Sequence, residues 1–284
     1  MPFLAILRFD LRTLMGSWLV RLWLAASVLL TLVIMLSCWK DVPSGQFLAY
    51  LLMPYLVFPW PLAVIVLGVD PVSGARIEAL ADGILSRPVT RYEYLVASWL
   101  ARVVMVLAVC LVVVLPASCI VYFATKRPAA DDSLTAYGLI ASLGVVGLVL
   151  TLQVTLAFCL GSLLRRPLVA VLVLLFIWYP VDLVLDQFSL EEFSPTSLNR
   201  ALPTLLRTPW SPTDEAKKDA PAVDAATIQA VMNWTPVLST PRKETFFDKG
   251  HYEDFSLWRV VLAYGTATLL AAGLATWNFS LRDL

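Results

Sequence analysis

The stretch YLVASWLARVVMVLAVCLVVVLPASCIVYF, from Tyr94 to Phe123, is 30 residues long and contains one charged side chain, Arg102. A helix needs about 20 mostly apolar residues to cross the hydrocarbon core of a bilayer. A run of this length is therefore typical of a membrane-spanning helix. We expect this helix to tilt in the bilayer or to project beyond it.

The whole chain has the same apolar character. Of its 284 residues, 59% are hydrophobic and 15% are charged, whereas soluble domains carry roughly 25% charged residues. The formal net charge is zero, so we expect no nucleic acid as a partner. The four cysteines lie in or at the ends of apolar runs and form no CxxC pair, which favours a packing role and no metal or cofactor. They are Cys38, Cys110, Cys119 and Cys159.

Six apolar runs are long enough to span a membrane. The second run contains Pro54, Pro59 and Pro61, which predicts a kinked or broken helix. The sequence therefore predicts an all-α polytopic membrane protein with six transmembrane helices. The runs are Ser17–Cys38, Phe47–Val69, Tyr94–Phe123, Ala136–Leu164, Leu168–Phe188 and Leu257–Trp277.

Basic side chains indicate the orientation of these spans. With the N-terminus in the cytoplasm, ten arginines lie on the cytoplasmic side and three basic residues lie in short outer loops, as the positive-inside rule requires. Both termini are then cytoplasmic. Arg21 and Arg102 fall inside apolar runs, and we expect them to extend towards the cytoplasmic surface. The inner set is Arg8, Arg12, Arg21, Arg76, Arg87, Arg91, Arg102, Arg165, Arg166 and Arg282, and the outer set is Lys40, Lys126 and Arg127.

Residues Pro2–Met15 mix apolar and charged side chains at helical spacing. This pattern predicts a helix that lies in the membrane interface before the first span. A cytoplasmic extension of that span is the alternative. With spans one to five, this helix makes up residues 1–188 of the expected organisation.

The tract Ser189–Ser256 separates the fifth and sixth spans and contains seven prolines. It is too long for an ordinary connection, and the orientation places it outside the cytoplasm. We expect either a small ordered cap, with a short helix at Val223–Trp234, or a flexible loop that binds an extracytoplasmic partner. Residues 257–284 then hold the sixth span and a cytoplasmic tail.

A charged segment, residues 70–91, connects the second and third spans on the cytoplasmic side. Its residues 73–85 have helical spacing. Ile77 and Leu80 share one stripe of this helix, and Glu78 and Asp82 share another. A short amphipathic helix of this kind is suited to docking a cytosolic partner.

The order of residues in this segment resembles the first cytoplasmic loop of ABC-2 type transporter permeases. That family often shows an acidic residue, Ser-Gly, a basic residue, an amphipathic coupling helix and then Ser-Arg-Pro-Val-x-Arg. The closing FSLRDL, residues 279–284, also resembles the short tail of these permeases. The sequence departs from the family at Ile77, at Ala79-Leu80-Ala81 and at Ala97-Ser98. The matching positions are Asp70, Ser73, Gly74, Arg76 and Ser86-Arg87-Pro88-Val89-Thr90-Arg91.

The resemblance implies a non-catalytic permease subunit in a prokaryotic cytoplasmic membrane. It is similar to the branch that contains copper-enzyme-maturation permeases and gliding-type exporters. No phosphate-binding G-x-x-x-x-G-K-[ST] motif occurs in the chain, so a separate ABC ATPase would supply the energy. A second permease chain, identical or related, would complete the path across the lipid bilayer. The implied ATPase-coupling residues are Ser73, Gly74, Arg76, Ile77, Glu78, Leu80, Asp82, Arg87, Pro88 and Arg91.

Polar residues inside the spans are candidates for a translocation path. Thr151, Gln153 and Thr155 lie in the fourth span, where they either pack helices together or contact a substrate. We expect Gln153, near the middle of the membrane, to find a hydrogen-bond partner. Asp182 and Asp186 lie near the outer end of the fifth span. They are either interfacial or part of a proton or cation site.

The sequence also bears on two other functions, those of a membrane enzyme and of a scaffold. A membrane enzyme is disfavoured because no H-E-x-x-H or G-x-S-x-G motif occurs, and because Asp182 and Asp186 share one helix instead of facing each other. A non-transporting scaffold that recruits a partner through residues 189–256 is the alternative to a permease.

Overall fold

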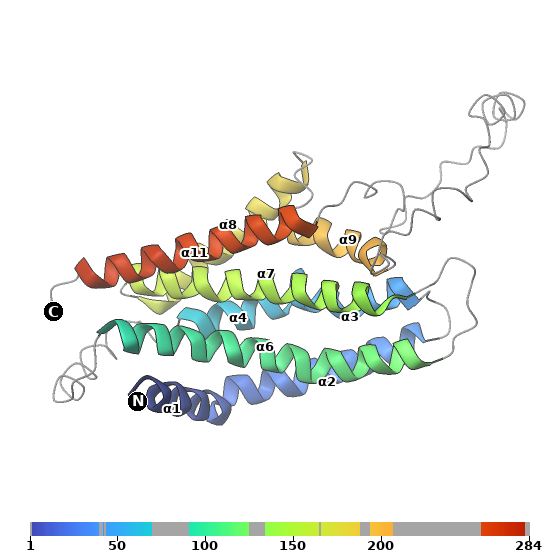
Figure 1. The fold of residues 1–284 in the computed structure, drawn as a ribbon, viewed down its shortest axis with the longest axis horizontal. Coiled ribbons are helices and arrows are strands. Elements are labelled where there is room, and N and C mark those ends of the chain that lie inside the picture. The colour runs from blue at the N-terminus through green and yellow to red at the C-terminus, as the bar shows by residue number, and fades with distance from the viewer. Residues whose placement is uncertain are drawn as a thin grey trace, which may run out of the picture.

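The computed structural model describes residues 2–39, 42, 44–69, 91–124, 134–164, 166–187, 194–206 and 257–281. These residues form long helices that run side by side in a bundle (Figure 1). The helices are α1 (Pro2–Gly16), α2 (Trp18–Cys38), α3 (Ser44–Leu56), α4 (Trp60–Val69), α6 (Arg91–Phe123), α7 (Ala136–Leu163), α8 (Pro167–Gln187), α9 (Pro195–Leu205) and α11 (Leu257–Leu281).

Within the described residues, five helical segments are long and apolar enough to cross a membrane, which confirms a polytopic helical membrane protein. They are Trp18–Cys38, Ser44–Val69, Tyr92–Phe123, Ala136–Leu163 and Leu257–Asn278. The apolar part of α8, Pro167–Val181, is shorter. The start of α1 and the end of α11 lie at the same end of the bundle (Figure 1).

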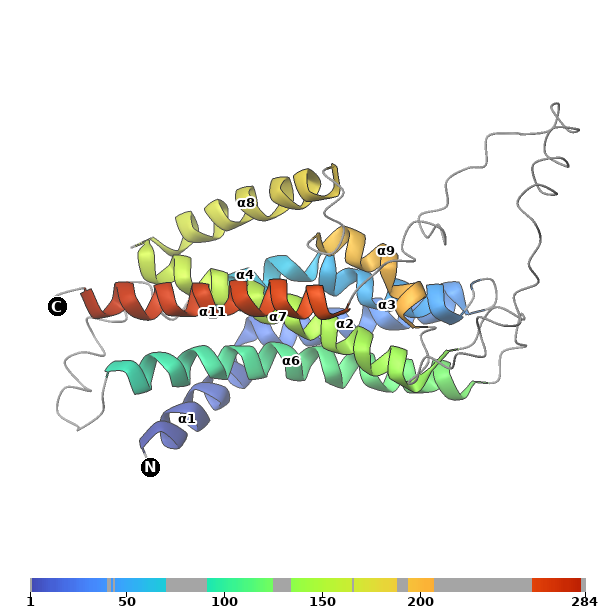
Figure 2. The ribbon, with the colours of Figure 1, turned by 45° about the horizontal axis from the view of Figure 1, so that its top comes forward.

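Helix α1 is separate from the first span, α2. Between them Ser17 has an extended backbone (φ −68°, ψ 139°), and its hydroxyl accepts a hydrogen bond from the Val20 N–H at 3.3 Å. This N-cap satisfies one of the amides that the start of a helix leaves free. Helix α1 therefore lies at an angle to α2 (Figure 2) and packs against α6. A continuous extension of the first span is excluded.

The second span is broken in the middle, as its prolines predict. Helix α3 ends at Leu56 and α4 begins at Trp60. Pro59 and Pro61 have no N–H for the preceding turn, so the helix cannot continue through them. The Tyr179 hydroxyl, from α8, donates to the Val57 carbonyl at 3.4 Å. One carbonyl freed by the break thus has a partner inside the bundle, as backbone at membrane depth requires.

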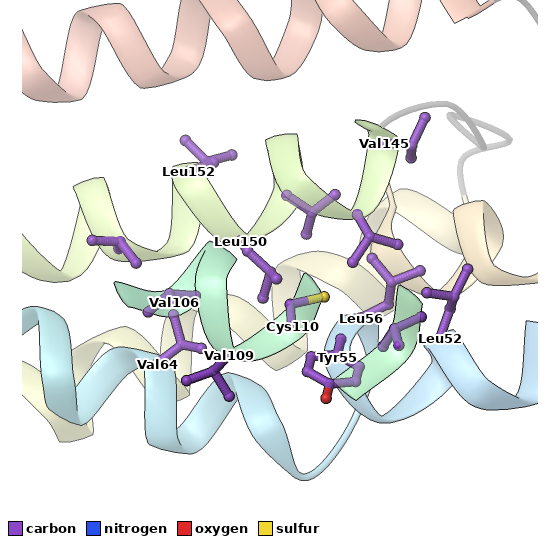
Figure 3. Packing of buried hydrophobic residues seen from close by; sticks show 14 of the residues in the cluster. Leu52, Tyr55, Leu56, Val64, Val106, Val109, Cys110, Val145, Leu150 and Leu152 are labelled. Carbon is purple, nitrogen blue, oxygen red and sulfur yellow. The ribbon is translucent and has the colours of Figure 1, made fainter. Parts of the chain in front are cut away.

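The core of the bundle lies where α3, α4, α6 and α7 meet. Figure 3 shows Leu56, Val64, Val106, Val109 and Leu150 converging there, and all five are buried. Helices α2 and α11 are mostly exposed along their length, so their apolar side chains are available to lipid. All four cysteines are free.

The first described part of the tract between α8 and α11 is a buried helix, α9, which packs on α3, α7 and α8. Thr135, the N-cap of α7, holds the end of α9. The N–H and the hydroxyl of Thr135 both donate to the Leu206 carbonyl, within 3.2 Å. A methyl group at Gly138 would lie 2.5 Å from the Leu206 carbonyl oxygen and 2.6 Å from that of Leu205. Gly138 therefore lets the end of α9 sit directly on the start of α7. The expected helix at Val223–Trp234 lies outside the described residues.

We predict that Gly138→Ala lowers the stability of the bundle by roughly 1–3 kcal/mol, because the added methyl overlaps the end of α9. Gly144→Ala is the matched control on the same helix, since nothing lies within 4 Å of a methyl group there. That change should be neutral or stabilising, because alanine is the better helix former. Thermal unfolding of both purified variants in detergent measures the difference. Equal unfolding temperatures would contradict the packing of α9 on α7.

Candidate functional site

The expected coupling segment connects the end of α4 with the start of α6. Residues 70–90, which include all the coupling candidates from Ser73 to Pro88, lie outside the described residues. The structure describes the residues on either side. Val69 ends α4, and Arg91 begins α6, although the side chain of Arg91 is not described. The described part of the candidate site therefore consists of the helices around these two ends.

Helix α4 is held against α7 by a contact between small residues. A methyl group at Gly68 would lie 2.5 Å from the Ala157 Cβ, and one at Gly161 would lie 2.9 Å from the Val69 carbonyl oxygen. Without those methyl groups the two helix backbones approach closely, as small residues allow in membrane proteins. This contact fixes the last turn of α4, from which the coupling segment continues.

Arg102 binds the same turn of α4 from the other side. Its Nε donates to the Leu67 carbonyl at 3.2 Å, and its Nη1 donates to both the carbonyl and the hydroxyl of Ser98, one turn earlier in α6. The side chain is only 7% exposed. Leu67 is among the last four residues of α4, whose carbonyls lack partners within the helix. A cation at this position also interacts favourably with the negative end of the helix dipole.

A second hydrogen bond joins α6 to α7 near the same level. The indole N–H of Trp99 donates to the Thr155 hydroxyl at 3.0 Å, and that hydroxyl donates to the Thr151 carbonyl within α7 at 2.7 Å. The Thr155 hydroxyl thus has both a donor and an acceptor. Together, Arg102, Trp99 and the glycine contact join α4, α6 and α7 into one frame, which we call the junction.

The structure separates the four candidates for a translocation path. Thr151 and Thr155 lie one turn apart on the stripe of α7 that faces α6, and each donates its hydroxyl to a carbonyl of its own helix. Gln153 lies about 200° around α7 from both, because successive residues of a helix turn by about 100°. Asp182 is part of α8, but its side chain is not described. Gln153 therefore does not share a face of α7 with Thr151 and Thr155.

Gln153 is completely buried, at 0% exposure. Neither its amide nitrogen nor its amide oxygen has a hydrogen-bond partner, although we expected an intramembrane glutamine to find one. It is one helical turn from Ala157, on the face of α7 that continues to Gly161. An unsatisfied buried polar group costs about 1–3 kcal/mol. Gln153 is therefore a point of low stability in the seam beside α4.

Sequence reasoning missed the role of Arg102. We expected it to extend towards the cytoplasmic surface. The structure shows it buried, reaching back along α6 to Ser98 and across to the end of α4. The signal was present, since an arginine inside a membrane span is a functional candidate by default. Its partner, the Leu67 carbonyl, could not be predicted, because every residue has a backbone carbonyl and this one lies 35 residues earlier in the chain.

The junction is suited to transmitting movement between helices. Its groups are a guanidinium, an indole, hydroxyls and backbone carbonyls, all in hydrogen bonds that position one helix on another. Within the described ranges, no group of three His, Cys, Asp or Glu side chains could hold a metal ion. A displacement of either end of segment 70–90 would reach α4, α6 and α7 together.

Comparison with known proteins leaves the family open. No family model matches the chain. No curated protein matches it significantly.

We predict that Gly68→Ala destabilises the bundle by roughly 1–3 kcal/mol, because α4 must move away from α7 to accommodate the methyl group. Thermal unfolding in detergent measures the loss. Gly265→Ala in α11 is the control, since its methyl group would meet nothing within 4 Å.

The double variant Gly68→Ala/Ala157→Gly tests the cause of that loss. It moves the methyl group from one helix to the other and should recover part of the stability, because the overlapping Cβ of Ala157 is gone. A double variant that is as unstable as the sum of the two single variants would show that the two positions are not in contact.

Proposed function

We propose that the chain is the membrane-spanning permease subunit of an ABC-2 type transporter. It couples ATP hydrolysis by a separate ATPase subunit to transport across the membrane. One observation supports the proposal: segment 70–90, whose residue order resembles the coupling loop of that family, follows directly on the turn of α4 that is fixed to α6 and α7. A segment that receives force from a partner needs a rigid attachment of this kind.

A six-span topology completes the proposal, with α8 as the fifth span in order. Helix α8 has 21 residues, so it is about 31 Å long at about 1.5 Å per residue, close to the thickness of the hydrocarbon core. An even number of crossings returns the chain to its starting side. The start of α1 and the end of α11 lie at one end of the bundle, which supports six crossings (Figure 1). The basic residues assign that end to the cytoplasm.

The mechanism begins at the coupling helix, residues 73–85. Ile77 and Leu80 are the apolar anchors for the ATPase, with Glu78 and Asp82 beside them. Closure of the ATPase on ATP shifts this helix as a rigid body. Because Arg102 fastens the last turn of α4 to α6, the second and third spans move together instead of separating. The other coupling residues that the resemblance implies are Ser73, Gly74, Arg76, Arg87, Pro88 and Arg91.

A second permease chain, identical or related, forms the other half of the path. The bundle buries its own core between α3, α4, α6 and α7, while α2 and α11 keep most of their surface exposed. Either of these outer helices can face lipid or the second chain. The assembly belongs in a prokaryotic cytoplasmic membrane.

We predict that the full chain, tagged and extracted from its native membrane in mild detergent, co-purifies with a cytosolic protein that contains a phosphate-binding loop. Ile77→Asp should reduce that recovery at least tenfold, because it places a charge at the apolar anchor. Ala79→Asp adds the same charge to a different face of the expected helix and should retain the partner. Recovery of extracytoplasmic partners alone would support the scaffold and refute the permease.

We predict that Arg102→Gln leaves the ATPase bound but lowers the ATP turnover of the reconstituted complex at least tenfold, because α4 and α6 no longer move together. Arg102→Lys retains the charge and should recover part of the turnover. Turnover measured in proteoliposomes checks both variants. Normal ATP turnover in Arg102→Gln would show that the junction has no role in coupling.

A further inference from the structure

The face of α1 that does not contact the bundle combines arginines with large apolar side chains. Arg8 and Arg12 are exposed and lie one helical turn apart. Leu4 and Met15 lie on one side of them, and Phe9, which is 69% exposed, lies on the other. The opposite face of α1 packs against α6. An exposed face of this composition fits a surface that is both apolar and negatively charged.

Neither arginine is neutralised within the described part of the chain. No hydrogen bond or ion pair involves Arg8 or Arg12 among those residues. Asp10, the acidic residue of α1, lies on the packed side of the helix, where its Oδ2 is buried. Both guanidinium groups are therefore available to an external anion.

The position of α1 relative to the lipid-facing surface of α2 indicates which anion it binds. Trp18, the first residue of α2, is 78% exposed, and it begins a stripe of exposed apolar residues that continues through Leu22 and Leu29. Tryptophan at the end of a lipid-facing stripe marks the boundary between the hydrocarbon and the headgroups. Helix α1 ends two residues earlier, at Gly16. The end of α1 therefore lies beside that boundary, within reach of the phosphate groups.

We propose that α1 binds anionic phospholipids through Arg8 and Arg12. The two guanidinium groups hold lipid phosphates and the negative headgroup beside them, while Leu4, Phe9 and Met15 enter the boundary between headgroups and acyl chains. Arg21 supports the geometry from α2, since its Nε donates to the Met15 carbonyl at 3.3 Å and thereby fixes the end of α1. This binding does not depend on the ATPase or on the transport function.

Native mass spectrometry of the full chain tests the proposal, with equimolar phosphatidylglycerol and phosphatidylcholine added to the detergent. The wild-type chain should retain phosphatidylglycerol in preference to phosphatidylcholine. Arg8→Gln/Arg12→Gln should lower that retention about 30-fold, because each basic side chain near an anionic surface contributes about fivefold. Arg8→Lys/Arg12→Lys should keep most of the preference.

Arg259→Gln is the matched control, because it removes the same charge from an exposed position at the start of α11. It should retain phosphatidylglycerol as the wild type does. Equal retention of the two lipids by the wild type, or unchanged retention in Arg8→Gln/Arg12→Gln, would overturn the proposal. An equal loss in Arg259→Gln would also overturn it, as would displacement of the lipid by inorganic phosphate at the same concentration.

Discussion

The hydrogen bond from Arg102 to the Leu67 carbonyl is the contact on which the cytoplasmic half of the proposed mechanism depends. The last carbonyls of a helix have no partner within it, and at membrane depth water does not supply one. Arg102 supplies a charged donor from a neighbouring helix, and Gly68 lets α4 approach α7 closely enough for the three helices to share one frame. The last turn of α4, from which the segment to α6 continues, is fixed by this arrangement.

The same constraint explains the broken second span. Three prolines in one span remove three backbone donors, and a lipid-exposed break would leave carbonyls without partners. The break between Leu56 and Trp60 is instead partly enclosed, with Tyr179 of α8 donating to the Val57 carbonyl. Helix α8 thus contributes to the second span as well as covering one side of the bundle (Figure 2). The second span thus consists of two helical segments, of which the second is fixed at its last turn by Arg102.

Apolar length predicted most of the fold, because in a membrane the length of a helix is set by the bilayer. The helices begin and end within about three residues of the limits of the predicted apolar runs, except that α11 continues to Leu281, and Pro59 predicted the break. Side-chain direction was harder to predict. The position of Arg102 near the end of an apolar run is compatible with a side chain that points to water and with one that points to Leu67. Only the packing of α4 beside α6 determines which direction the side chain takes. We expected Gln153 to form a hydrogen bond, but its side-chain amide has no hydrogen-bond partner. Helix α9 was hidden in a polar, proline-rich tract because its burial depends on α3 and α7, which are distant in sequence.

The central claim is that residues 73–85 contact an ATPase, and photo-crosslinking in cells tests it most directly. A photoreactive phenylalanine analogue at position 77 should crosslink to a cytosolic protein with a phosphate-binding loop, while the same group at the exposed, lipid-facing Leu29 should not. A crosslink to such a protein from position 77 alone is the result that the account predicts. Crosslinking from position 77 only to lipid, or to proteins without a phosphate-binding loop, would contradict it.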